Sequence, residues 1–362
     1  MNDEIALSVV MATYNRAEII RETLQHLAEQ DLDPTEFEVI VVDDGSPDHT
    51  RAVVEEWIPQ APFRLTYLHH ENHGPGYTQN RGIEMAKAPL VLLIADDILL
   101  EPHAVGAHLE THRDHPKPEV AVLGRVEESP LLTSQSVFRG KWDHFQFSRF
   151  SGVRELPYYR FWACNISVKK DFVLRHGPYL EHRGRAGAAA HEDPQLGYQL
   201  SRAGLRILWC PEALGFHYQM TSFEEACKRR YMQGLNFGEF HQHAPAPEIP
   251  VAYHVLNWRT LSDHLRAVFG PRRRYLEGPD RNPALLVLRH LARAVLFNGV
   301  IVSRVWEPLI RAAEHNSAIA RVMNAQLYRG VLFYHFLRGC RDGYRKFDRP
   351  RGSIGRAQPS PR

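Results

Sequence analysis

The sequence has few cysteines and almost no net charge, and each shortage excludes a class of protein. Its four cysteines, Cys164, Cys210, Cys227 and Cys340, lie far apart in a chain of 362 residues, without the paired spacing of a zinc site. They indicate isolated thiols in a reducing compartment and not a disulfide scaffold. The formal net charge is only +2, which argues against a nucleic-acid-binding surface spread over the whole molecule.

Long apolar runs are also lacking. The two longest runs near the C-terminus, 284–288 and 294–302, are separated by Arg289, His290 and Arg293, so neither reaches the roughly 18–20 residues that cross a membrane. The first residues carry acids where a signal peptide has basic residues. We therefore expect a cytoplasmic protein whose C-terminal helices either pack on the rest of the chain or lie peripherally on a membrane surface.

The first third of the chain alternates short apolar runs with helical patterns, which is typical of βαβ units and a mostly parallel sheet. The predicted strands are Leu7–Ala12, Phe37–Val42, Arg64–His69, Leu90–Ala95 and Val120–Leu123. Asn15 with Glu18 predicts a capped helix after the first strand, and Ser46 with Pro47 predicts another after the second. A third helix is expected over Tyr77–Ala86.

The remainder divides at a proline-rich segment. A strand over Phe161–Val168, a helix over Pro194–Ala203 and a strand over Arg206–Cys210 lead to a capping box of Ser222 and Glu225. Residues 243–250 then break the helical pattern. We expect a catalytic domain over 1–242, a helical extension over 251–347 and a disordered basic tail over 348–362.

Polar residues follow three of the predicted strands. They are the segment Thr13, Tyr14, Asn15 and Arg16, the pair Asp43 and Asp44, and the pair Asp96 and Asp97. Because ligands of open α/β sheets bind beyond the carboxyl ends of the strands, we expect these residues to share one crevice.

Five segments carry a resemblance to a known family. They are 8–16, 41–46, 74–82, 93–99 and 191–197. In order and spacing, over about residues 5–240, they resemble the family 2 inverting glycosyltransferases. The resemblance implies an α/β fold of the GT-A type. It also implies metal-dependent transfer of a sugar, with inversion, from a nucleotide-diphosphate sugar to a hydroxyl of a glycan, lipid-linked or other cell-surface precursor. We expect the donor to be a UDP-sugar.

The metal site follows from the charge of the diphosphate, which a hard divalent cation can offset. The resemblance makes Asp96 the main ligand of Mn²⁺ or Mg²⁺, with Asp97 beside it and His217 completing the site. Ile94 stands where the family carries the first aspartate of its motif. That departure removes a group often used on the ribose.

The remaining donor and acceptor contacts come from the same resemblance. Asp44 is expected to bind the nucleobase or ribose, unless it only helps to form the turn that follows. Arg81 is expected to pair with phosphate or with the aspartates, and Trp162 and Asn165 to shape the sugar and acceptor pockets. For Arg81 and Trp162 the alternatives are a surface arginine and a core aromatic.

Transfer with inversion needs a carboxylate that takes the proton of the acceptor hydroxyl. The resemblance places this base at Asp193, with Glu192 as a supporting acid. The alternative is that Asp193, directly before Pro194, only caps a helix.

Two other enzyme classes are excluded by single positions. A Rossmann oxidoreductase needs a glycine-rich turn after the first strand, where this chain has residues 13–16 without a glycine. A dehalogenase-type phosphatase needs an aspartate where this chain has Val42. A non-catalytic nucleotide-sugar or glycan-binding relative of the same fold stays open because of Ile94, although Asp96, Asp97 and Asp193 argue against it.

Overall fold

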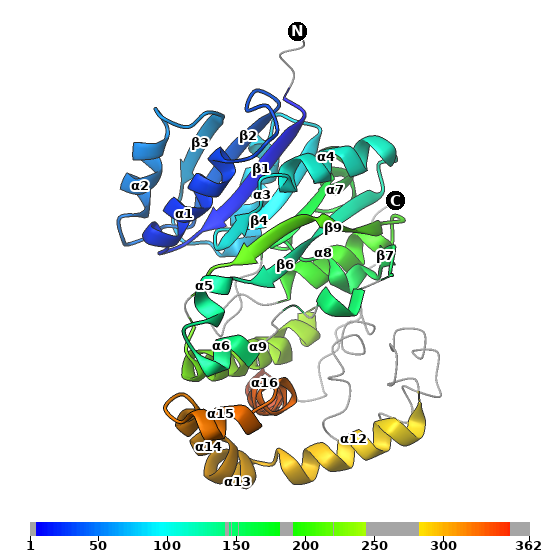
Figure 1. Cartoon of the computed structure of the whole chain (residues 1–362). Coiled ribbons are helices and arrows are strands. Elements are labelled where there is room, and N and C mark those ends of the chain that lie inside the picture. The colour runs from blue at the N-terminus through cyan, green and yellow to red at the C-terminus, as the bar shows by residue number, and fades with distance from the viewer. Residues whose placement is uncertain are drawn as a thin grey trace.

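The described strands form one mixed sheet that is flanked by helices (Figure 1). The computed structural model describes residues 5–141, 145, 147–150, 152–181, 191–219, 221–243 and 282–347. The strand order is β3-β2-β1-β4-β8-β6-β9-β5, with β7 on the outer side of β9. This architecture confirms the predicted α/β fold with a mostly parallel sheet flanked by helices.

The first four strands are parallel, and their bounds agree with the prediction to within one residue. They are β1 (Leu7–Thr13), β2 (Phe37–Asp43), β3 (Arg64–His69) and β4 (Leu90–Ala95). The other strands are β5 (Ile98–Leu100), β6 (Val120–Glu128), β7 (Glu155–Leu156), β8 (Asn165–Lys169) and β9 (Arg206–His217). Here β8 runs antiparallel to both β4 and β6, while β6 and β9 are parallel.

Three predicted strands have the wrong bounds. The strand expected over Val120–Leu123 continues to Glu128. The strand expected over Phe161–Val168 begins only at Asn165, because 158–160 form a 3₁₀ turn. The strand expected over Arg206–Cys210 continues to His217, since a shift of register after Gly124 lets β9 stay paired with β6. The sequence showed neither feature, because Pro211 and Gly215 read as the end of a strand.

Helices cover the sheet and its ends. They are α1 (Ala17–Ala28), α2 (Thr50–Trp57), α3 (Pro75–Met85), α4 (Ala104–Asp114), α7 (Lys170–His176) and α8 (Glu192–Ser201). Helix α3 packs on β1 and β2, whereas α4 packs on β6 and β9. The stretch between β6 and β8 contains the short helical turns α5 (Pro130–Thr133), α6 (Val137–Lys141), η1 (Phe147–Phe150) and η2 (Tyr158–Arg160).

The predicted caps of the first two helices are wrong. Asn15 adopts a left-handed conformation (φ 56°) and does not cap α1, and Ser46 lies four residues before α2. Asp48 takes both roles instead: its carboxylate accepts hydrogen bonds from the backbone N–H groups of Ala17 and Thr50, at 3.2 and 3.0 Å. One side chain from the second loop therefore serves both helix starts, which a local cap signal cannot show.

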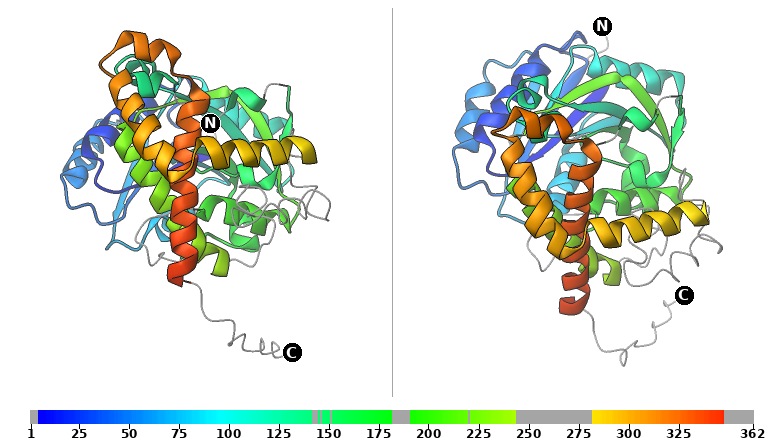
Figure 2. Two further views of the ribbon diagram at one scale, coloured as in Figure 1. Left: turned by 90° about the horizontal axis from the view of Figure 1, so that it is seen from below. Right: turned by 60° about the horizontal axis from the view of Figure 1, so that its bottom comes forward.

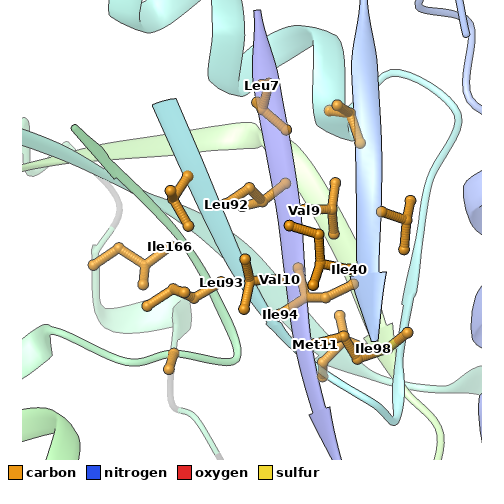
Figure 3. Close-up of a cluster of buried hydrophobic side chains, with 14 of the residues drawn as sticks. Leu7, Val9, Val10, Met11, Ile40, Leu92, Leu93, Ile94, Ile98 and Ile166 are labelled. Carbon is orange, nitrogen blue, oxygen red and sulfur yellow. The ribbon is translucent and has the colours of Figure 1, made fainter. Parts of the chain in front are cut away.

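The core lies between β1, β2, β4 and β8. Val10, Met11, Leu93 and Ile94 are fully buried there, as Figure 3 shows. Continuous apolar runs of this kind are typical of strands buried on both faces of a sheet. Ile94, which replaces the family's first aspartate, is thus part of this core.

The C-terminal helices lie beneath the sheet and dock on it through α9 (Phe223–His243), as Figures 1 and 2 show. They are α12 (Pro283–Leu296), α13 (Gly299–Ile301), α14 (Glu307–Ala313), α15 (Ser317–Val322) and α16 (Ala325–Phe347), with a π-helical turn η5 (Val302–Trp306). The predicted capping box at the start of α9 is confirmed: Ser222 and Glu225 exchange hydrogen bonds.

Glycines allow α9 and α16 to pack closely. A methyl group on Gly234 would lie 2.0 Å from the carbonyl oxygen of Phe336, and one on Gly339 would lie 2.0 Å from that of Tyr231. A second apolar cluster joins α9 to the extension, with Phe138, Cys227, Val302 and Tyr328 at its centre. The boundary segment 243–250 and the tail lie outside the described residues, apart from His243. None of the described helices is long and apolar enough to span a bilayer.

Candidate active site

The carboxyl ends of β1, β2 and β4 lie side by side. The register pairs Thr13 with Asp43 and Ala12 with Ala95, and the backbone N–H of Asp44 donates to the carbonyl of Thr13 at 3.0 Å. The polar segments that follow these strands therefore meet at one edge of the sheet.

Asp96 and Asp97 form a buried carboxylate pair at this edge. Asp96 Oδ2 accepts a hydrogen bond from Thr13 Oγ1 at 2.7 Å, and Asp97 Oδ2 lies 3.2 Å from Arg16 Nη1. Burial, and next the charge of Asp97, raises the pKa of Asp96 to about 6. Burial acts in the same direction on Asp97, but His217 and Arg16 outweigh it and hold its pKa down at about 2.

His217 closes the pair from the opposite strand. The β5–β9 ladder sets Ile98 against His217, which brings the imidazole Nε2 to 3.6 Å from Asp97 Oδ2. Its Nδ1 lies 3.4 Å from Glu128 Oε2, and Glu128 is in turn paired with Arg139. Burial alone would lower the pKa of His217, but the two carboxylates raise it to about 9.

The chemistry of these groups fits a divalent cation in part. Within the described ranges, no group of three or more His, Cys, Asp or Glu side chains is arranged to hold a metal. However, Mg²⁺ commonly uses one or two carboxylates with the remaining ligands from substrate phosphates and water, and Asp96 with Asp97 supplies such a pair. His217 fits only as neutral imidazole, so a metal must displace its ring proton.

Asp193 lies in the first turn of α8, where its carboxylate is held at both oxygens. Oδ2 accepts the backbone N–H of Ala163 at 2.9 Å, and Oδ1 accepts the phenol of Tyr179 at 3.0 Å. The residue at the N-cap is His191 (φ 76°), so the alternative role of Asp193 as the cap is wrong. Burial raises the pKa of Asp193 to about 6.

Cys164, directly before β8, lies between Asp193 and the buried pair along the backbone contacts. The N–H of the preceding residue, Ala163, donates to Asp193, and the carbonyl of Cys164 accepts the N–H of Ala95, the residue before Asp96. The thiol pKa of Cys164 is raised first by burial and then by the charges of both Asp193 and Asp97. Asp193 and the buried pair therefore both lie near Cys164.

Two residues that were predicted to contact the sugar donor, Asp44 and Arg81, bind other groups of the protein. Asp44 Oδ1 accepts the N–H of His73 at 2.7 Å, and both of its oxygens accept the N–H of Gly74. Arg81 does not reach the aspartates: it pairs with Glu84 at 2.9 Å and Glu181 at 3.3 Å. The pairing with Asp96 or Asp97 is thus corrected, because α3 directs this side chain toward the segment after α7.

Asn165 does not line a pocket. It is fully buried, its Oδ1 lies 2.9 Å from His108 Nε2, and its Nδ2 donates to the carbonyls of Ala213 and Arg125. The amide joins β8 to β6, β9 and α4, so the predicted sugar contact is corrected to a role inside the sheet. The strand register, not the sequence, decides which face this residue takes.

Trp162 lies in an aromatic cluster. Its ring is 5.4 Å from that of Phe147, and the guanidinium of Arg160 lies 4.9 Å above it. Of the nearby aromatic stretch, Phe138 packs against the C-terminal helices and Phe145 packs edge-on against His217 at 5.4 Å. Tyr14, in contrast, is 48% exposed at the sheet edge and is accessible to a ligand.

Three residues at the site escaped the sequence reasoning: Glu128, Tyr179 and Arg229. Arg139 and Arg229 line a cleft beside His217, together with Arg230. The charge of Arg229 also contributes to the low pKa of Asp97. The run of three basic residues at 228–230 is visible in the sequence, but the helix face that each occupies is not.

Known proteins resemble this chain. Residues 8–159 match the family described as Glycosyl transferase family 2. A validoxylamine A glucosyltransferase of Streptomyces hygroscopicus subsp. limoneus is 32% identical over 273 residues, covering 67% of this chain and 58% of that protein. A glucosyl-dolichyl phosphate glucuronosyltransferase of Haloferax volcanii is 27% identical over 251 residues, covering 64% of this chain and 75% of that protein.

The same fold occurs in a solved mannosyltransferase. That enzyme, from Pyrobaculum calidifontis in complex with GDP-Man and Mn²⁺, has a TM-score of 0.55 at 18% identity, with coverage of 95% of this chain and 88% of that one. The chain spans about three fifths of the length of the validoxylamine glucosyltransferases that it matches, at 58% and 62%.

Asn165→Ala is expected to destabilise the protein without weakening donor binding. The change leaves His108 and the carbonyl of Ala213 without their buried partner, at a cost of about 1–3 kcal/mol in the free energy of unfolding. Urea denaturation measures this cost, and calorimetry with nucleotide sugar measures affinity. Normal stability combined with lost donor affinity would restore Asn165 as a sugar contact.

Proposed function

Since the sheet domain of this chain belongs to glycosyl transferase family 2, we propose that the protein transfers a sugar, with inversion, from a nucleoside diphosphate sugar to an acceptor hydroxyl. The observation that carries this proposal is the partly buried carboxylate of Asp193, which the backbone of Ala163 holds next to Cys164, the residue whose carbonyl binds Ala95 beside Asp96. One carboxylate suits proton removal and the pair suits a diphosphate with its cation.

Asp193 is the proposed general base. The acceptor oxygen forms a bond to the anomeric carbon while its proton passes to Asp193, and the bond from that carbon to the diphosphate breaks with its electrons on the leaving oxygen. Burial keeps the pKa of Asp193 near 6, so the group is ionised at neutral pH and still basic enough to accept a proton. Glu192, next to it in the first turn of α8, is proposed to support this role or to contact the acceptor.

Asp96 and Asp97 are the residues that would hold Mn²⁺ or Mg²⁺, with His217 once its ring proton has left. A bound cation supplies positive charge that stabilises the departing diphosphate. Arg16 and Arg229 add fixed positive charge close to the same pair, as their effect on the pKa of Asp97 indicates. The mannosyltransferase of the same fold was solved with GDP-Man and Mn²⁺, which supports a metal-assisted reaction here.

The nucleotide is proposed to lie across the ends of β1 and β2, against Thr13, Tyr14, Asn15 and Arg16, with Asp44 nearby. Asp44 already accepts two backbone N–H groups, so it is proposed to act on the nucleotide through its remaining lone pairs. We propose a UDP-sugar as the donor. For the acceptor, we propose a glycan, lipid-linked or other cell-surface precursor. The glucosyl-dolichyl phosphate in the name of the glucuronosyltransferase relative is a lipid-linked compound of this class.

We propose that the catalytic domain covers 1–242 and that the helices after 251 form an extension that meets a membrane surface. The support is α12, which carries exposed apolar side chains. Leu285, Leu288, Leu291 and Val295 are 43–65% exposed on one face of this helix. Arg304 and Arg321 are exposed on the same extension and suit anionic lipid headgroups.

Removal of divalent metal is expected to lower transfer at least about 100-fold, because the charge stabilisation by a metal is worth several kcal/mol. Donor turnover is measured after exhaustive chelation and again after addition of Mn²⁺ or Mg²⁺. Asp96→Asn should abolish metal-dependent nucleotide binding in calorimetry, whereas Asp114→Asn, an exposed aspartate at the end of α4, should not. Full activity after chelation contradicts the metal role.

Asp193→Asn is expected to lower transfer by about 10²–10⁴-fold while donor affinity is retained. In the wild type, transfer should rise as pH increases through about 6, where Asp193 ionises. Because its folded pKa is raised above the unfolded value, Asp193 contributes stability at low pH that is lost as pH rises through about 6. The variant should therefore melt at the same or a higher temperature at pH 8.

Near-normal transfer by Asp193→Asn would exclude this residue as the base and direct attention to Glu192. Donor binding without turnover by the wild type, across a panel of nucleotide sugars with Mn²⁺ and Mg²⁺, would favour the non-catalytic alternative that Ile94 leaves open.

The α12 face is expected to bind anionic vesicles, which vesicle flotation measures. Leu288→Glu combined with Leu291→Glu should lower binding at least about ten-fold, since two apolar side chains no longer enter the interface. Leu174→Glu, at an exposed apolar position of α7, is the matched control and should change nothing. Equal flotation of all three proteins contradicts the membrane role.

A further inference from the structure

Helix α3 holds the segment 179–181 through hydrogen bonds, close packing and an ion pair. Asn80 exchanges two buried hydrogen bonds with the backbone of Tyr179, donating to its carbonyl and accepting its N–H, both at 2.9 Å. Gly76 lies so close that a methyl group there would meet the carbonyl oxygen of Leu180 at 2.6 Å. Arg81 adds an ion pair to Glu181. Three residues of the segment 74–82 thus hold the three residues 179–181 that follow α7.

The segment presents Tyr179 to Asp193. The tyrosine side chain is buried and its phenol donates to Asp193 Oδ1 at 3.0 Å, while the backbone N–H of Ala163 donates to Oδ2 at 2.9 Å. Two donors from different elements therefore fix the plane of one carboxylate. Each oxygen keeps a free lone pair for a proton, because a carboxylate oxygen can accept more than one hydrogen bond.

We propose that Tyr179, held in place by Asn80, is a positioning residue that orients the Asp193 carboxylate for proton transfer. This inference rests on the proposed role of Asp193 as the base. The segment 74–82 thereby gains a second function. Besides contacting Asp44 through Gly74, it holds Tyr179 beside the proposed base. No residue of α3 needs to touch the acceptor for this function.

Of the residues that the structure describes, three ionisable groups lie near Asp193. They are the phenol of Tyr179, the thiol of Cys164 and the carboxylate of Glu192. Burial and the charge of Asp193 raise the pKa of Tyr179 well above its usual value, so the phenol stays a donor throughout the working range of pH. The thiol likewise stays protonated. The Tyr179 hydrogen bond favours the ionised form of Asp193, in opposition to burial.

The test is Tyr179→Phe, examined by kinetics and by the titration of Asp193. We expect the rate at saturating substrate to fall about 10- to 100-fold, as for loss of one hydrogen bond to an ionised group, with the donor KM unchanged. The acidic limb of the pH profile should move to higher pH. Carbon-13 NMR of protein labelled at the aspartate carboxyls, with Asp193→Asn to assign the signal, should show the same upward displacement without any turnover.

Tyr67→Phe is the matched control, because it removes a phenol bonded to Asp43 at 2.6 Å in the same domain. It should leave the Asp193 titration and the acidic limb where they are in the wild type. Asn80→Ala should move both in the same direction as Tyr179→Phe. Melting temperatures of all variants report folding.

An Asp193 signal that titrates identically in wild type and Tyr179→Phe overturns the inference, and so does an unchanged maximal rate. If Tyr179→Phe moves the Asp193 titration and the acidic limb but Asn80→Ala moves neither, the proposed role of Asn80 in holding Tyr179 is overturned. Absence of transfer by the wild type refutes the proposed function instead, and the NMR titration then still decides whether Tyr179 acts on Asp193.

Discussion

The structure depends on compensation of negative charge that is buried at the carboxyl edge of the sheet. Asp97 lies at the centre, with Arg16 from the start of α1 and His217 from the end of β9 as its partners. On the other side of the imidazole, Glu128 pairs with His217 and is itself paired with Arg139. An unpaired buried carboxylate is costly, so these elements have to come together for the edge of the sheet to be stable.

This constraint connects the sheet to the helices beneath it. Arg139 belongs to α6, and the neighbouring Phe138 enters the apolar cluster with Tyr328 of α16. Glu314 of the extension also accepts the backbone N–H groups of Val137 and Phe138. The polar edge and the C-terminal helices thus share one short segment, and a change in how the extension docks would reach the pair at Asp97 through it.

The second acidic group is held differently. Within the described part of the chain, the partners of the Asp193 carboxylate are neutral: a phenol and a backbone N–H. Neutral donors orient a carboxylate but offset its burial only in part, which is why its pKa is raised while that of Asp97 is lowered. Two aspartates of one site are thereby suited to different tasks: one to stay charged beside a cation and one to exchange a proton.

The sequence by itself determined the positions of the first four strands, the capping box of α9 and the family resemblance, because apolar runs and local caps are short-range signals. It also brought Asp44, Asp96 and Asp97 to one edge, since parallel strands end together. It did not determine the faces that Asn165 and Arg81 occupy, nor the shared cap at Asp48, nor the partnership of Tyr179 with Asp193. Those depend on strand register and on contacts between residues distant in the chain, as between Asn80 and Tyr179. Only the tertiary structure sets such distances, because nothing in a local pattern records which elements will pack together.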